Sequence, residues 1–198
     1  MNSPHTPTFW KEGRQGAVSL VYLGLEPPAW DWVLAHHAAV GIRASLVCRE
    51  ADARLSLPVS RNWDLMADGR LPASADALKR LDGRGTRGYF AEVPPEGPPP
   101  LFCLSTREGL LPGPMPDLQV PLPSYPAPEA LALLQQQIES VVVQGKWLIL
   151  RFDEGALSRL GAESHRKLLQ GLGDHHARIW CAPVRDIALF RWEGAAPD

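Results

Sequence analysis

The sequence lacks several features that would assign it to a broad class at once. It contains no run of 18 apolar residues, so we expect no transmembrane helix. Its formal net charge of −2 provides no basic field for nucleic acid or an anionic membrane. Its 3 cysteines lie far apart, which predicts reduced thiols and not a disulfide framework or a zinc site. The first residues contain no apolar signal-peptide core, so we expect a cytoplasmic protein.

The composition that remains is ordinary for a globular domain. A chain of 198 residues with 45% hydrophobic and 21% charged residues suits one domain. We expect residues 1–15 to be a loosely ordered lead-in and residues 16–192 to form that single domain. Twelve of the 20 prolines lie in residues 93–128, so this Pro-rich segment cannot be mainly helical. We expect an ordered loop across one end of the domain or, as an alternative, a surface that faces a partner.

Apolar strands and amphipathic helices alternate near both ends of the chain. Ala17–Leu23 and Trp147–Phe152 are nearly continuous apolar runs, which are typical of parallel strands buried on both faces. Further strands are predicted at Ile42–Cys48, Tyr89–Val93, Leu101–Ser105 and Arg178–Cys181. Helices are predicted to begin at Pro27, Pro128 and Pro183, and one more helix is predicted to carry Leu160, Leu168, Leu169 and Leu172. This order predicts an α/β fold with parallel strands and right-handed crossovers.

Two stretches resemble a known family. Residues 145–190 contain W-x-x-x-x-F-D-E-G, then H-R-x-L-L, then R-I-W-x-A-P-V, in the order found at the C-terminal end of the polysaccharide deacetylases (NodB-homology proteins, carbohydrate esterase family 4). Residues 16–48 are similar to the first motif of that family and to its following helix and strand. The resemblance implies a distorted (β/α)7-type barrel.

The same resemblance places the family's active-site positions on other residue types. The deacetylases hydrolyse acetyl groups with a metal held by one Asp and two His, an Asp base and a His acid. Their first motif, T-F-D-D-G, aligns with residues 21–25, so the base falls on Leu23 and the metal-binding Asp on Gly24. The catalytic His at the end of the strand that begins at Trp147 falls on Asp153.

The middle of the chain resembles the family more faintly. Arg61–Gly69 resembles the helix before the second motif, and the two His ligands then fall on Ala75 and Lys79, in an expected helix at Ser74–Leu81. The Arg that orients the catalytic Asp falls on Val93. No D-D pair and no H-x-x-x-H occurs anywhere in the sequence. We therefore expect no bound metal, no cofactor and no metal-dependent deacetylase activity.

Polar side chains at the end of a barrel strand still need an interpretation. Asp153 and Glu154 follow a predicted strand, where α/β barrels place their sites. Asp153 could work in acid–base catalysis with Glu26, Glu92 or Glu96, or it could only cap the helix that follows.

The histidines and one strand arginine have simpler interpretations. His37 and His165 lie on apolar helix faces and are expected to be buried, hydrogen-bonded core residues. His175 and His176 suit a helix C-terminus. Arg151 interrupts an apolar strand, where an ion pair with a carboxylate at the strand end is plausible.

Three functional hypotheses stay open. The first is a pseudoenzyme whose barrel mouth binds a glycan or a protein partner, through the positions Tyr22, Leu23, Gly24, Ala75, Asp153 and Glu154. The second is an active hydrolase of acetylated carbohydrate with a rebuilt, metal-independent site around Asp153. In the third, the barrel only packs against a partner subunit.

Overall fold

A parallel sheet forms the centre of the molecule. The computed structural model describes residues 10–24, 29–48, 63–68, 88–91, 102–105, 118–121 and 127–195. Its strands are β1 (Gly16–Leu23), β2 (Ser45–Cys48), β3 (Asp64–Asp68), β4 (Gly88–Ala91), β5 (Phe102–Ser105), β6 (Leu118–Pro121), β7 (Trp147–Asp153) and β8 (Ile179–Cys181). They pair in the order β5-β4-β3-β2-β1-β7-β6, and β8 also pairs with β1. All the strand pairs are parallel, as predicted.

The sheet is a distorted barrel that does not close, because β5 and β6 are the two ends of the strand order. Residues 17–23 of β1 pair with the whole of β7. On the other edge of β1, Gly16–Val18 pair with β8 and Val21–Leu23 pair with β2. Two strands therefore share one edge of β1, which distorts the barrel at this place. The predicted α/β barrel fold is confirmed.

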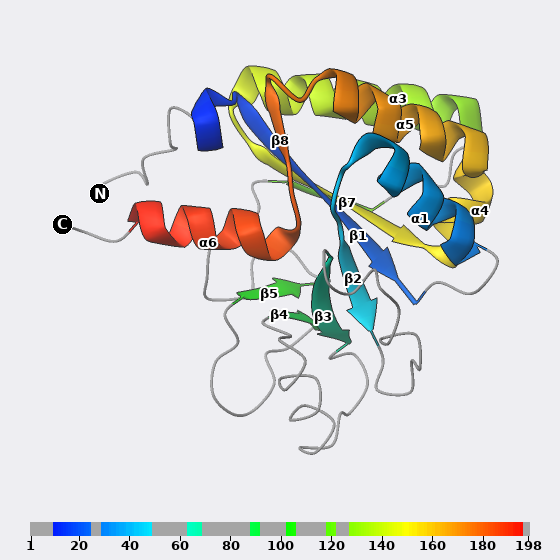
Figure 1. The fold of residues 1–198 in the computed structure, drawn as a ribbon, viewed down its shortest axis with the longest axis horizontal. Helices are drawn as coiled ribbons and strands as arrows, with labels where there is room; N and C mark the ends of the chain where they lie inside the picture. The colour runs from blue at the N-terminus through cyan, green and yellow to red at the C-terminus, as the bar shows by residue number, and fades with distance from the viewer. Residues whose placement is uncertain are drawn as a thin grey trace, which may run out of the picture.

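The helices cover the two faces of the sheet unequally. They are α1 (Ala29–Val40), α3 (Ala127–Gln144), α4 (Glu154–Leu160), α5 (Ala162–Asp174) and α6 (Val184–Ala195). In Figure 1, α1, α3, α4 and α5 group together along β1 and β7, whereas α6 lies apart from them. None of the helices in the described ranges is long and apolar enough to cross a membrane.

The alternation of side chains along β1 divides the core in two. Val18, Leu20 and Tyr22 pack with residues of α1, α3 and α5 in one buried cluster. Ala17 and Val21 point the other way and pack with residues of α6 and β7 in a second cluster. Because successive strand residues point to opposite faces, neighbouring residues of β1 belong to different parts of the molecule.

Three expectations about secondary structure were wrong. Arg61–Gly69 was expected to be the helix before the second motif, but residues 64–68 form β3, in which Asp64 and Met66 are buried. Residues 118–121, expected to be loop, form β6 beside β7. The helical segment after β7 is broken into α4 and α5 at Gly161, whose φ of 75° is left-handed.

Other expectations concern residues that the structure describes only in part. The strand predicted at Leu101–Ser105 is confirmed as β5, and Tyr89–Val93 overlaps β4. The helix expected at Ser74–Leu81 lies outside the described residues. So do Val93 and most of the Pro-rich segment.

The start of the described chain is packed against the domain. Trp10 is 2% exposed, and its Nε1 donates to the Gly145 carbonyl oxygen at 3.0 Å. Its ring lies 6.4 Å from that of Phe190 in α6. Residues 10–15 therefore belong to the packed domain, whereas residues 1–9 lie outside the described residues.

Candidate functional site

The ends of β1 and β7 bring together the positions that the resemblance singled out. Leu23 and Asp153 are the last residues of their strands and are direct neighbours in the ladder. Gly24 follows with a left-handed φ of 54°, which ends the strand. We call Leu23, Gly24, Asp153 and Glu154 the mouth residues, because barrels place their sites at this end of the strands. Ala75, which was also expected at the mouth, lies outside the described residues.

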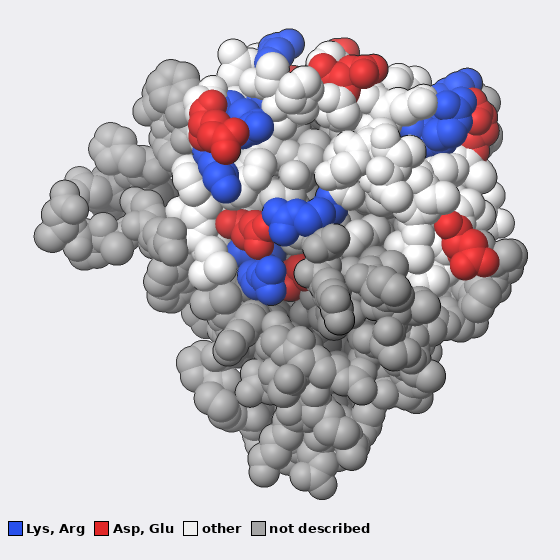
Figure 2. Space-filling view, in the orientation of Figure 1, with Lys and Arg blue, Asp and Glu red and all other residues white. Residues whose placement is uncertain are grey.

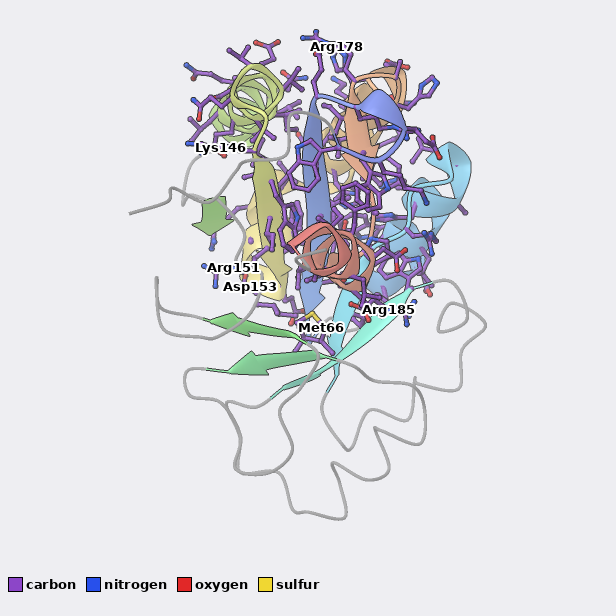
Figure 3. The ribbon with its side chains drawn as sticks, turned by 90° about the vertical axis from the view of Figure 1, so that its left-hand side faces the viewer. Met66, Lys146, Arg151, Asp153, Arg178 and Arg185 are labelled. Carbon is purple, nitrogen blue, oxygen red and sulfur yellow. The ribbon has the colours of Figure 1, made fainter. Side chains whose placement is uncertain are left out.

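Asp153 has a structural task at the mouth. Its Oδ1 accepts a hydrogen bond from the Ala156 amide at 2.6 Å, so it is the N-cap of α4. The capping interpretation of Asp153 is therefore confirmed. Its side chain and that of Glu154, in the first turn of α4, are exposed. Figure 3 shows Arg151 close to Asp153 at the same end of β7.

Tyr22 does not line the mouth. It is fully buried, and its hydroxyl lies 2.8 Å from His37 Nε2 and 2.7 Å from His165 Nε2. Its ring stacks on that of Phe152 with a centroid separation of 5.2 Å. Tyr22 therefore belongs to the core between the sheet and the helices, on the face of β1 opposite to Leu23.

The interpretation of His37 and His165 as buried, hydrogen-bonded core residues is confirmed. They are 2% and 0% exposed. Burial is the main cause that lowers the pKa of His37 to about 4 and that of His165 to about 3, and neighbouring imidazoles add to it. Both rings are therefore neutral at pH 7. His175 follows the last residue of α5, and His176 Nδ1 contacts the Gly173 carbonyl oxygen, as expected at a helix C-terminus.

A second polar group lies at the start of α6, and the sequence analysis missed it. Ser45 and Asp64 are neighbours in the ladder between β2 and β3. Ser45 Oγ accepts from the Val184 amide at 2.9 Å and donates to Asp64 Oδ2 at 3.2 Å. The same Oδ2 accepts from the Arg185 amide at 3.3 Å. The two side chains thus hold the first turn of α6.

The Asp64 carboxylate is held at an energetic cost. It is 1% exposed, and among the described residues no partner reaches its Oδ1. Burial raises the pKa of Asp64 to about 6, although the Arg185 charge and two hydrogen bonds oppose that shift. Asp64 begins β3, at the end away from the mouth, so this group anchors α6 and does not extend the mouth. Only the assignment of residues 64–68 as a strand could have revealed it.

The charges on the visible face occur mainly as pairs. Figure 2 shows Lys and Arg beside Asp and Glu over the described part of this face. Arg43 and Asp186 are 2.7 Å apart, and Arg14 and Glu12 are 2.6 Å apart. Such exposed pairs contribute little to stability. Within the described ranges, no three His, Cys, Asp or Glu side chains are placed to hold a metal ion.

Comparison with known proteins gives matches in structure alone. No protein-family model matches the chain, and no curated protein matches it in sequence. Puue allantoinase matches with a TM-score of 0.70 and 12% identity, covering 100% of this chain and 96% of that one. A Pseudomonas aeruginosa PAO1 protein described as a probable polysaccharide deacetylase matches with a TM-score of 0.63 and 13% identity, covering 100% and 96%.

A third solved structure comes from a carbohydrate-active enzyme. The Xyl-CE4 domain of a multidomain xylanase from the hindgut metagenome of Trinervitermes trinervoides matches with a TM-score of 0.58 and 12% identity. That match covers 93% of this chain and 94% of the other. At these identities the likeness concerns the fold. The chain therefore has the α/β barrel fold of the polysaccharide deacetylases.

Proposed function

We propose that this protein is a polysaccharide deacetylase-like pseudoenzyme that lacks metal-dependent deacetylation and binds a carbohydrate at the barrel mouth. The observation that carries the proposal is the paired position of Leu23 and Asp153. The resemblance assigns the base to Leu23, whose side chain can neither take a proton from water nor bind a metal. It assigns the His acid to Asp153, whose carboxylate caps α4.

The carbohydrate part of the proposal rests on the fold. Two of the compared structures are named for polysaccharide deacetylation or for a xylanase, and both share this barrel. An exposed carboxylate beside the half-buried Leu23 and Gly24 gives the mouth polar and apolar surface together. Sugars present hydroxyl groups and apolar ring faces, so they suit such a surface.

Metal analysis and ligand binding test the proposal together. The purified chain is incubated with Zn²⁺ or Co²⁺, dialysed, and examined for bound metal and for release of acetate from N-acetylglucosamine oligomers and acetylated xylan. We expect no stoichiometric metal and no acetate release, but binding to at least one glycan on an array. Stoichiometric metal with acetate release would refute the pseudoenzyme. If no glycan on the array is bound and one specific protein is captured instead, the ligand of the mouth is a protein partner and not a carbohydrate.

Two substitutions locate the binding at the mouth. Leu23→Lys places a long charged side chain beside the end of β7 and should abolish glycan binding. Val143→Lys is the matched control, because Val143 is 82% exposed on α3 and lies outside the mouth residues. Equal loss of binding in both variants would show that the glycan does not bind at the mouth.

A metal-independent hydrolase is the second candidate, because the Asp153 carboxylate is exposed at a barrel mouth. Two variants separate its chemical task from its structural one. Asp153→Asn keeps an N-cap and removes the carboxylate, whereas Asp153→Ala removes both. If the wild type releases acetate without metal and Asp153→Asn abolishes that release with the fold intact, the hydrolase replaces the pseudoenzyme.

A further inference from the structure

Four side chains form one continuous hydrogen-bonded chain from the helix layer into the core. His36 Nδ1 lies 3.1 Å from His165 Nδ1, and His165 Nε2 lies 2.7 Å from the Tyr22 hydroxyl. The same hydroxyl lies 2.8 Å from His37 Nε2, and His37 Nδ1 lies 2.9 Å from the Ile42 carbonyl oxygen. His36 is partly exposed, whereas His165, Tyr22 and His37 are buried. We call these four side chains the imidazole–phenol chain.

The Ile42 carbonyl fixes the position of every proton in the neutral chain. A carbonyl oxygen only accepts, so His37 Nδ1 carries a hydrogen and His37 Nε2 is an acceptor. Tyr22 must therefore donate to His37, and its oxygen must accept from His165 Nε2. The remaining nitrogen of neutral His165, Nδ1, is then an acceptor. His36 donates to it from Nδ1 and keeps a lone pair on its Nε2.

The contact between His36 and His165 has the geometry of a hydrogen bond and not of a metal chelate. The two rings are inclined by only 28°, and their centroids lie 5.4 Å apart. The two Nδ1 atoms thus meet nearly head-on along the line between the ring centres. A tetrahedral zinc site would instead need the two lone pairs to converge at an angle on a common point.

Among the described residues, the charged groups that act on the imidazole–phenol chain lie at its outer end. Arg166 lowers and Glu163 raises the pKa of His36, although desolvation is the larger cause of its lowering. Glu163 and Arg166 form an ion pair on the surface of α5. Around the inner end, the packed neighbours Phe152 and Trp63 carry no charge. Within the described part of the chain, His36 is therefore the ring of the four through which a proton can enter from solvent.

We propose that the imidazole–phenol chain takes up one proton at His36 and relays it to His37, with reversal of each hydrogen bond between its four side chains. His36 Nε2 gains the proton, and the hydrogen on His36 Nδ1 passes to His165 Nδ1. The hydrogen on His165 Nε2 passes to the Tyr22 oxygen, and the original Tyr22 hydrogen passes to His37 Nε2. One positive charge moves from His36 to His37, and each contact again has one donor and one acceptor.

A second proton cannot be accommodated in this way. If His36 and His37 are both cationic, the Tyr22 oxygen faces two N–H donors and its own hydrogen has no acceptor. If His36 and His165 are both cationic, two N–H groups meet head-on. A buried donor without a partner is costly, so a second proton disrupts the core. The phenol itself does not ionise, because burial raises the pKa of Tyr22 well above 10.0.

Imidazole nitrogen spectra of the ¹⁵N-labelled full chain test the proposal between pH 8 and pH 4. At pH 8, His36 and His37 should be Nδ1–H tautomers and His165 the Nε2–H tautomer. On acidification the three rings together should gain one proton while the near-ultraviolet circular dichroism stays native. A His165 Nδ1–H tautomer at pH 8, or two cationic rings in the native fold, would overturn the proposal.

Tyr22→Phe tests the relay itself, because it removes the hydroxyl that hydrogen-bonds to both His165 and His37. In the wild type, the His37 Nε2 shift should follow the titration of His36. In Tyr22→Phe that response should vanish, and an unchanged response would refute the relay. His175→Gln is the control, because His175 is exposed at the end of α5 and its loss should leave the response intact. If Tyr22→Phe does not fold, the wild-type tautomers and proton count decide alone.

Discussion

Lowering the pH from 8 to 5 should destabilise the fold, because the imidazoles of His36, His37 and His165 take up two fewer protons in the folded chain than in the unfolded chain. The folded pKa values of His37 and His165, about 4 and about 3, lie below the ordinary histidine value of 6.5. Between 6.5 and these values the unfolded state binds more protons than the folded one. The stability that the neutral rings contribute is therefore present above pH 6.5 and is lost as the pH falls.

Asp64 works in the opposite direction. Its folded pKa of about 6 lies above the ordinary aspartate value of 3.8, so between these two pH values the folded state binds the extra proton. Acidification from pH 8 to 5 thus relieves part of the cost of burying its charge. A pKa difference changes the free energy of unfolding by about 1.4 kcal/mol per pH unit. At pH 5 each buried imidazole therefore lowers the free energy of unfolding by about 2 kcal/mol relative to pH 8, and Asp64 raises it by about 1.4 kcal/mol. The net loss is about 3 kcal/mol.

Urea unfolding at pH 8 and pH 5, followed by far-ultraviolet circular dichroism, measures this difference. Asp64→Asn removes the carboxyl group whose protonation opposes the effect of the imidazoles. In this variant the free energy of unfolding should therefore fall by about 4 kcal/mol between pH 8 and pH 5. The exposed carboxylates Glu12 and Glu163, whose pKa values are lowered by their Arg partners, lose their contribution only below this window. An unfolding free energy that is equal at the two pH values in Asp64→Asn would refute the reasoning.

Six substitutions at five positions test the packing and the caps by urea or thermal unfolding. Asp153→Ala should cost about 1 kcal/mol through loss of the α4 cap, and Asp153→Asn much less. Ser45→Ala should cost about 1–3 kcal/mol, because a buried amide of α6 loses its acceptor. Gly24→Ala should cost roughly 1–2 kcal/mol, because an alanine is strained in the left-handed backbone conformation of Gly24. No steric clash adds to this cost, because no neighbouring atom lies within 4 Å of the added methyl group. Leu134→Ala should cost about 2–5 kcal/mol, whereas Val143→Ala on the same helix should change little.

Strong hydrophobic patterns in the sequence predicted the elements at both ends of the chain. The apolar run from Trp147 corresponds to β7, and the period of Leu131, Leu134 and Ile138 corresponds to α3. Each signal combines period, length and a flanking breaker, and each element packs as its pattern requires. These elements also set the register that places Leu23 next to Asp153.

The remaining features depend on contacts that no local pattern contains. β3 has only five residues, and its alternation of Asp64 and Met66 is too short to outweigh an expected helix. The hydrogen bonds of Asp64 to Ser45 and to α6 join segments far apart in the chain. Sequence analysis predicted that His37 and His165 are buried, but not that Tyr22 joins them across 143 residues.

The alternation along β1 explains how a barrel can keep its fold while its mouth changes chemically. Tyr22 and Leu23 are adjacent, yet the Tyr22 hydroxyl hydrogen-bonds to histidines of α1 and α5, whereas Leu23 lies at the mouth beside Asp153. Substitution of Leu23 leaves every hydrogen bond of the imidazole–phenol chain in place, because the two side chains lie on opposite faces of the strand. Loss of the Tyr22 hydroxyl would instead leave two buried imidazole nitrogens without their hydrogen-bond partner. Buried hydrogen bonds therefore constrain Tyr22, whereas Leu23 makes only partly buried apolar contacts with the second cluster, so a change at Leu23 disturbs the barrel less.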